Sequence, residues 1–302
     1  MKIAISGATG FIGSHLTARF EKQGEQVIKL TRSDFKAGVK HLISHLENCA
    51  VIINLAGEPL NRRWSPSYMQ AIYNSRIETT RLLVAAVKEM GSRPRTLIST
   101  SAIGAFTSSG RYTEHDTPNA SDFLGNITRE WEQEAQKAAD LGVRTLIFRF
   151  ALVLGCEGGL IKQVLPPFRM GLGGTIGDGS QPFSWVHIDD LTRAYEFALA
   201  HPEMEGIYHI CAPNPVTNRI FTKTLGQLLH RPTLLPVPVT FLQLAFGKGA
   251  EAITSGQCVV SERLPQAGFV FEFDTIDKAL QEIIAETPQK QKPSKSKETN
   301  VK

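Results

Sequence analysis

Short apolar runs alternate with longer segments of helical periodicity along most of the chain. The first run, residues 2–6, meets a glycine-rich turn, and the next segment places Phe11, Leu16 and Phe20 on one helical face. Further apolar runs lie at residues 25–32, 50–57, 95–106 and around residue 149. This alternation predicts a parallel sheet covered by helices. We expect an α/β fold: a Rossmann-like doubly wound parallel sheet with a smaller C-terminal α+β substrate lobe.

Three glycines follow the first apolar run at a spacing of three residues. Between a strand and a helix, such glycines permit a tight turn, close approach of the backbone to a pyrophosphate, and close packing of the helix on the sheet. The phosphates then lie at the positive end of the helix dipole. The sequence therefore predicts a dinucleotide site, with contacts from Gly7, Ala8, Thr9, Gly10, Phe11, Ile12 and Gly13.

The second apolar run indicates which dinucleotide is bound. It ends in Thr31 and Arg32, where an acidic residue would bind the free 2′-hydroxyl of NAD(H). An arginine suits a 2′-phosphate, so NADP(H) is preferred and NAD(H) is possible; the alternative is an ordinary surface arginine. Residues 33–49 then predict one short helix in place of the usual third strand.

Other cofactor contacts are expected along the same edge of the sheet. Residues 65–90 predict a long helix that begins at Ser65 as cap, with Pro66 in its first turn. Arg76 on this helix points either to solvent or to a phosphate. The remaining expected contacts are Leu55, Ala56, Gly57, Thr100 and Leu152.

The C-terminal half begins with a glycine-rich segment, residues 155–185, which predicts a lid or pocket-forming loop without regular structure. There Arg169 can bind an anionic substrate group, and Gln181 and Trp185 can line the pocket; the alternative is a structural loop over the sheet edge. We expect a nucleotide-binding core at residues 1–154, a lid and substrate lobe with elements returning to the core at 155–286, and a disordered Lys-rich tail at 287–302.

The motifs together resemble a known superfamily. "SGATGFIGSHL", "NSRIETTRLL", "STSAIG" and "GDGSQPFSWVHIDDL" are similar to segments of the extended short-chain dehydrogenase/reductase superfamily, and within it to the group labelled epimerase family proteins, a branch of nucleoside-diphosphate-sugar epimerases. The resemblance runs from residue 1 to about residue 285. It implies a cofactor-dependent epimerase, dehydratase or reductase acting on an unidentified small molecule, such as a nucleotide sugar.

One part of the superfamily pattern is missing. The resemblance places the substrate-orienting serine at Ser101. The proton-transferring tyrosine and its lysine partner would fall on Leu124 and Thr128, or on Phe123 and Ile127 after a slip of one residue. None of these side chains serves as an acid or base, so the standard proton transfer is not supported.

Two parts of the chain offer candidate substitutes for the missing acid. Tyr112, Glu114 and His115 lie in a loop that can reach the cofactor or can be an ordinary polar surface loop. His187 precedes a helix and can act in the site or be structural. We therefore keep two functional hypotheses: an NADP(H)-dependent enzyme using Ser101 with another acid, and a non-catalytic NADP(H)-binding sensor or regulator.

Composition excludes several other classes. The content is 42% hydrophobic and 21% charged, and the net charge is only +4, so nucleic-acid binding is not expected. No apolar stretch approaches the roughly 18 to 20 residues that span a membrane, so membrane insertion is not expected either. The four cysteines are widely spaced, which suggests neither a metal site nor a disulfide framework. We expect a cytoplasmic protein that binds a small-molecule substrate. The resemblance implies a homodimer formed through the helices at 65–90 and 126–140.

Overall fold

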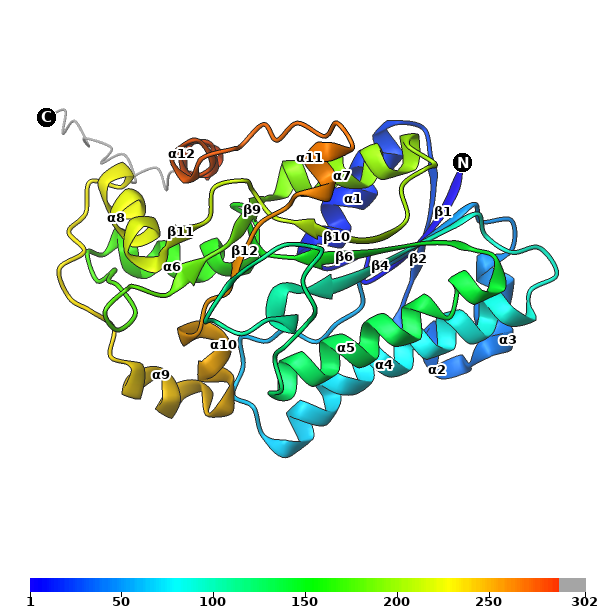
Figure 1. The fold of residues 1–302 in the computed structure, drawn as a ribbon, viewed down its shortest axis with the longest axis horizontal. Coiled ribbons are helices and arrows are strands. Elements are labelled where there is room, and N and C mark those ends of the chain that lie inside the picture. Colours follow the sequence, from blue (N-terminus) through cyan, green and yellow to red (C-terminus); the bar gives the residue numbers. More distant parts are fainter. Residues whose placement is uncertain (288–302) are drawn as a thin grey trace, which may run out of the picture.

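A computed structural model describes residues 1–287, except for the side chains of residues 252 and 253. The Lys-rich tail expected at 287–302 therefore lies, beyond its first residue, outside the described residues. The rest divides into a broad α/β layer and an adjoining group of helices and short strands (Figure 1).

Six parallel strands form the central sheet, in the order β10-β6-β4-β3-β1-β2. They are β1 (Lys2–Ser6), β2 (Gln26–Leu30), β3 (Val51–Asn54), β4 (Thr96–Ala102), β6 (Arg144–Phe150) and β10 (Gly206–Ile210). The chain order reverses between β1 and β3, which is the switch point where such sheets bind ligands. The sheet ends at β2, so the expected loss of a third strand is confirmed, as is the doubly wound fold.

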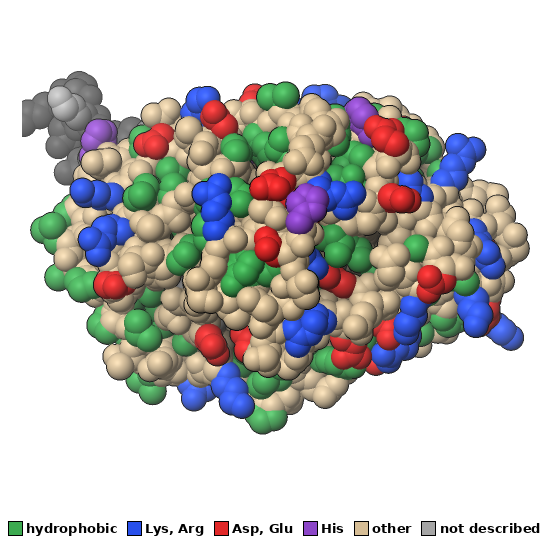
Figure 2. All heavy atoms as spheres, viewed as in Figure 1, with side chains coloured by type: hydrophobic (Ala, Val, Ile, Leu, Met, Phe, Trp, Pro, Cys, Tyr) green, Lys and Arg blue, Asp and Glu red, His purple; other side chains and the backbone are tan. Residues whose placement is uncertain are grey.

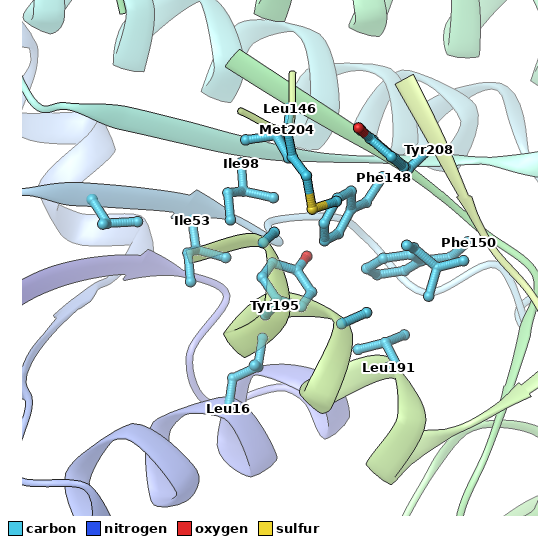
Figure 3. Close-up of a cluster of buried hydrophobic side chains, with 14 of the residues drawn as sticks. Leu16, Ile53, Ile98, Leu146, Phe148, Phe150, Leu191, Tyr195, Met204 and Tyr208 are labelled. Atoms are coloured by element: carbon cyan, nitrogen blue, oxygen red, sulfur yellow. The ribbon is translucent and has the colours of Figure 1, made fainter. Parts of the chain in front are cut away.

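Helices cover both faces of this sheet (Figure 1). One face carries α1 (Phe11–Lys22), α7 (Ile188–Ala200) and α11 (Arg263–Gln266), and the other carries α2 (Arg32–Ala37), α3 (Val39–Leu46), α4 (Pro66–Glu89) and α5 (Phe123–Gln136). Under the first face, Leu16 of α1 and Tyr195 of α7 point toward Ile53, Ile98 and Phe148 of the sheet (Figure 3). These side chains are fully buried, so the glycine turn before α1 is mounted on a rigid core.

The second group of elements consists, apart from β5, of residues that follow β6, and it carries its own apolar core. Its strands pair as β7 (Leu152–Leu154) with β9 (Trp185–His187), β8 (Pro182–Phe183) with β11 (Val216–Thr217), and β5 (Arg111–Tyr112) with β12 (Cys258–Val259). Its helices are α6 (Gly159–Arg169), α8 (Asn218–Leu228), α9 (Val239–Phe246), α10 (Glu251–Thr254) and α12 (Ile276–Glu286). Short 3₁₀ turns lie at Ile103–Ala105, Ala139–Leu141 and Lys248–Ala250.

The helix predicted at 65–90 is confirmed together with its cap. Ser65 Oγ accepts a hydrogen bond from Tyr68 N, and Pro66 begins the helix. Pro66 suits this place because the first helical N–H has no intrahelical partner.

Two sequence expectations are wrong. Residues 33–49 form two helices rather than one, since Gly38 has φ +91° and separates α2 from α3. The glycine-rich segment 155–185, expected to lack regular structure, contains the eleven-residue helix α6. Ile161, Leu165 and Phe168 bury one face of this helix, which offsets the prolines in its last turns.

The surface is mixed in charge. Figure 2 shows Lys and Arg side chains interspersed with Asp and Glu over the visible face, without a broad patch of one sign. Among residues 1–287, no helix is long and apolar enough to span a bilayer.

Candidate functional site

The glycine turn between β1 and α1 leaves space that a side chain would fill. Gly7 has φ +70°, and a Cβ there would lie 2.8 Å from Leu55 O. A Cβ on Gly13 would lie 2.2 Å from Gly7 O. Gly10 N donates to Gly7 O at 3.0 Å and closes the turn. Because helix α1 begins directly after Gly10, this backbone fits the phosphates of a dinucleotide.

The end of β3 is held against this turn. Ser6 Oγ donates to Asn54 Oδ1 at 2.7 Å and accepts from Leu55 N and Ala56 N at 3.2 Å each. Asn54 Nδ2 in turn donates to Thr80 Oγ1 at 2.8 Å. The structure therefore brings the expected contacts at residues 55–57 beside those at 7–13, and Asn54 has a structural role.

Arg32 lies at the end of β2 as the first residue of α2. Thr31 caps this helix: Asp34 Oδ2 accepts from Thr31 N and Thr31 Oγ1, both at 2.7 Å. The hydrogen bond from the Thr31 hydroxyl is the main reason that the pKa of Asp34 falls to about 2. The Arg32 side chain is 83% exposed, and its guanidinium pairs with Glu58 Oε1 at 2.5 Å.

Arg76 lies beneath the loop that follows β3 and carries Gly57 and Glu58. Its guanidinium packs under Gly57, where a Cβ would come within 3.2 Å, and donates to Glu58 O at 3.1 Å. Burial lowers the pKa of Arg76 to about 10. In this structure it supports the loop around Glu58, and contact with a phosphate stays a prediction.

The face of α5 toward the sheet carries Leu124, Thr128 and Glu132 at intervals of one turn. Thr128 Oγ1 is occupied by a hydrogen bond to Leu124 O at 2.8 Å. Leu124 packs beside Gly104, just after β4. The positions that the resemblance assigned to a tyrosine and a lysine are thus filled by an apolar side chain and a helix-bound hydroxyl, while the next turn presents a carboxylate.

That carboxylate belongs to a buried polar row that crosses three strands. Ser101 of β4 is in register with Arg149 of β6, which is in register with His209 of β10. Glu132 accepts from Ser101 Oγ at 2.5 Å and from Arg149 Nε and Nη2 at 2.7 Å each. Ser101 and Arg149 are each 1% exposed, so the Ser101 hydroxyl is bound inside the protein.

The row continues to the edge of the sheet through His209. Its Nδ1 lies 3.0 Å from Val260 O, and its backbone N donates to Glu114 Oε1 at 2.9 Å. Burial lowers the pKa of His209, which favours the neutral ring beside Arg149. His209 is thus held by the Val260 carbonyl and the Glu114 carboxylate, and buried polar groups normally have such partners.

Tyr112 is a half-buried phenol that adjoins this row through Phe106. Its ring stacks on that of Phe106, with 4.6 Å between the ring centroids. The Arg149 guanidinium lies 5.3 Å from the centroid of the Phe106 ring. The Tyr112 hydroxyl lies 2.7 Å from Thr107 Oγ1 and accepts from Asn119 Nδ2 at 3.1 Å. These hydrogen bonds, that of Thr107 foremost, lower the pKa of Tyr112.

His187 lies in a different environment from the other candidates. Its Nδ1 accepts from Asp189 N at 3.2 Å and so caps α7, which leaves Nε2 to bind Glu282 Oε2 at 2.8 Å. The ring stacks on Phe273 at 3.9 Å, and burial lowers its pKa. These contacts describe a structural histidine, which is one of the two interpretations that the sequence left open.

The expected substrate contacts are dispersed. Trp185 is fully buried in the core of the second group, where its indole N donates to Asn214 O at 3.3 Å, so it does not line an open surface. Gln181 is half-buried and donates to Ile176 O at 3.2 Å. Arg169 ends α6 and is half-buried.

The two remaining cofactor candidates lie on different surfaces. Thr100 Oγ1 is 3.4 Å from the buried hydroxyl of Tyr195, on the face of the sheet under α7. Leu152 is 42% exposed and opens a segment whose glycines at 155, 158 and 159 pack against the ring of Phe11. This segment therefore lies across from the glycine turn.

Sequence reasoning missed Glu58, Glu132 and His209. Glu132 was detectable, because it lies one helical turn beyond the position of the missing lysine. Glu58 directly follows "NLAG" at the strand end. His209 carried no signal in its own stretch, since only the sheet register places it beside Arg149.

Comparison with known proteins agrees with this architecture. Residues 3–211 match the NAD dependent epimerase/dehydratase family, and residues 237–283 match a domain of unknown function. The chain is 36% identical to the chloroplastic epimerase family protein SDR39U1 homolog of Arabidopsis thaliana, over 94% of this chain and 87% of the relative. It is 34% identical to epimerase family protein YfhF of Bacillus subtilis, over 95% and 99%.

Solved structures give the same result. The crystal structure of human epimerase family protein SDR39U1 with NADPH superposes with a TM-score of 0.87 at 32% identity, covering 95% of this chain and 100% of the other. A nucleoside-diphosphate sugar epimerase from Corynebacterium glutamicum superposes with a TM-score of 0.75 at 28% identity, covering 94% and 58%. On this evidence, the chain belongs to the NAD dependent epimerase/dehydratase family.

Proposed function

We propose that the protein binds NADP(H) at the glycine turn, in preference to NAD(H), and that this site handles a small molecule. The observation that carries the proposal is the exposed Arg32 beside the turn, paired with Glu58 Oε1 at 2.5 Å. A 2′-phosphate can replace that carboxylate and accept two parallel hydrogen bonds from the guanidinium. The human relative crystallised with NADPH supports the choice.

Calorimetric titration with NADPH, NADP⁺ and NADH tests this proposal. Replacing Arg32 by alanine should weaken NADPH binding by about 10- to 100-fold, the worth of a charge-assisted hydrogen bond, and leave NADH binding unchanged. Arg95→Ala is the matched control. This exposed arginine lies just before β4, at the amino ends of the strands, whereas Arg32 lies at their carboxyl ends. Equal losses in both variants, or none in either, would make Arg32 an ordinary surface arginine.

We call the region of Ser101 and Tyr112 the nicotinamide end of the cofactor site. There we propose hydride transfer to or from a carbonyl or hydroxyl carbon of the small molecule. The bound cofactor supplies or accepts the hydride. Tyr112 is the candidate acid, because Thr107 and Asn119 hold its hydroxyl and lower its pKa. A nucleotide sugar is the substrate class suggested by the Corynebacterium glutamicum relative.

A second function, non-catalytic sensing of NADP(H), is favoured by one specific observation. The Ser101 hydroxyl, which would orient a substrate, is bound to Glu132 at 2.5 Å and buried. Single-turnover oxidation of bound NADPH with a panel of nucleotide sugars and simple carbonyl compounds separates the two functions. Turnover that falls in Tyr112→Phe supports the enzyme. Tight NADPH binding without turnover on any compound supports the sensor.

We also propose a homodimer formed through α4 and α5, which lie side by side on one face (Figure 1). A hollow of about 380 Å³ near their N-terminal ends is lined by Met69, Tyr73 and Phe123 among others. These apolar side chains could bury against a second copy. A monomer in sedimentation velocity at micromolar concentration would contradict this arrangement.

A further inference from the structure

Three side chains on α2 and α3 bring ligand atoms together on the surface. His41 and His45 are one turn apart on α3, and Asp34 faces them from α2. His41 Nε2 lies 3.0 Å from Asp34 Oδ1 and 3.1 Å from His45 Nε2. His45 Nε2 lies 3.7 Å from Asp34 Oδ1. The break at Gly38 turns α2 back onto α3 and makes this arrangement possible.

A proton on His41 Nε2 can form a hydrogen bond in only one of its two contacts, with Asp34 or with His45. If His41 Nε2 carries a proton, it can donate well to Asp34 or to His45. If it carries none, its lone pair faces the Asp34 oxygen at 3.0 Å, which is repulsive. A cation at the centre would accept a lone pair from all three atoms at once, so the arrangement suits a metal better than a set of hydrogen bonds.

The spacing fits one coordination geometry. In a tetrahedral zinc site with bonds of 2.0–2.1 Å, neighbouring ligand atoms are about 3.3 Å apart. The three separations here, 3.0, 3.1 and 3.7 Å, lie on either side of that value. We propose that Asp34, His41 and His45 form a zinc site with three protein ligands and a fourth position open to solvent.

The carboxylate is already oriented for this role. Asp34 Oδ2 accepts both hydrogen bonds of the Thr31 cap, which leaves Oδ1 directed toward the histidines. Metal ligands are commonly fixed by such a second set of hydrogen bonds. The Asp34 side chain is 14% exposed, whereas those of His41 and His45 are 42% and 39% exposed, so a metal can enter from solvent.

A second cluster in the described residues, His187 with Asp189 and Glu282, is less suited to a metal. Both nitrogens of His187 are engaged, Nδ1 by Asp189 N and Nε2 by Glu282. A metal bound by Nδ1 would displace the cap of α7, and one bound by Nε2 would replace the contact with Glu282. The cluster on α2 and α3 requires no such loss.

The test uses the full chain without a histidine tag, freed of metal by a chelator and then titrated with zinc chloride in a calorimeter. We expect one equivalent to bind, and cobalt(II) to give the intense visible absorption of tetrahedral coordination. His45→Ala should weaken zinc binding by about tenfold or more, as loss of metal-site contacts does. His115→Ala is the control, an exposed histidine 3.9 Å from a single carboxylate.

Two results would overturn the site: no saturable binding of zinc, or equal losses in the His45 and His115 variants. His41→Ala is the second variant, and thermal unfolding of each variant shows that the fold is intact. The experiment contains no nucleotide. Its failure would therefore leave the proposed NADP(H) site untouched, and failure of that site would not affect this one.

Discussion

The two ends of the cofactor site match the family pattern to different degrees. At the phosphate end, the glycine turn has the geometry that a dinucleotide cradle needs, and Arg32 is exposed and paired with Glu58. At the nicotinamide end, Leu124 and Thr128 fill the proton-transfer positions, and Ser101 is bound to Glu132. The difference is between a glycine turn that is kept and proton-transfer positions that are not, in separate parts of one fold.

The physical reason is that different atoms perform the two functions. Phosphates are bound by backbone N–H groups and a helix dipole, so the neighbouring side chains can vary as long as the glycines remain. Proton transfer depends on one side chain with a suitable pKa at one place. A chain can therefore lose the second property while it keeps the first.

The largest effect is expected from breaking the buried pair at the nicotinamide end. Arg149→Met leaves the Glu132 carboxylate buried and without its partner, which should lower the free energy of unfolding by about 3–5 kcal/mol. Urea unfolding measures this change. The double variant with Glu132→Leu should recover most of the loss. A cost below about 1 kcal/mol for the single variant would contradict a structural role.

A smaller effect is expected at the phosphate end. The Cβ of Gly13→Ala would lie 2.2 Å from Gly7 O, which forces a backbone shift. We expect about 1–3 kcal/mol of destabilisation and much weaker NADPH binding, measured by unfolding and calorimetry. Gly91→Ala is the control, because a Cβ there meets nothing within 4 Å. Unchanged NADPH affinity in Gly13→Ala would show that the turn does not hold the cofactor.

The smallest effect concerns the pair of His187 and Glu282, outside both ends. Burial, together with the neighbouring Glu286 carboxylate, to which protonated Glu282 can donate, raises the pKa of Glu282 to about 8 from its usual 4.5. Between these values the folded state keeps a proton that the unfolded state releases, so this carboxyl lowers stability as pH rises. Glu282→Gln should therefore raise the melting temperature at pH 8 and not at pH 4.

The gain should be at most about 1 kcal/mol, because the carboxyl is partly exposed to solvent. Thermal unfolding at several pH values measures it. The exposed Glu89→Gln at the end of α4 should show no such dependence on pH. A gain that is the same at both pH values would mean that Glu282 is not protonated in the folded state.

Much of the fold could be predicted from local patterns. The cap at Ser65 and the turn at Gly7 are each specified by a few neighbouring residues, and both are present. Helix α6 was missed because its glycine-rich surroundings masked Ile161 and Leu165, which lie one turn apart on its buried face. The glycine content of this segment suggested a loop, whereas its helical periodicity would have predicted the helix.

The sequence by itself determined the cradle for a dinucleotide and the absence of the tyrosine and lysine. Both depend on residues close together in the chain. Only the tertiary structure decided which polar side chains lie beside those positions, because Ser101, Arg149 and His209 meet through the lateral register of three strands. It also placed Asp34 against the histidines of α3, through a change of direction at Gly38. Local patterns specify backbone geometry, whereas contacts between distant segments depend on how the elements pack.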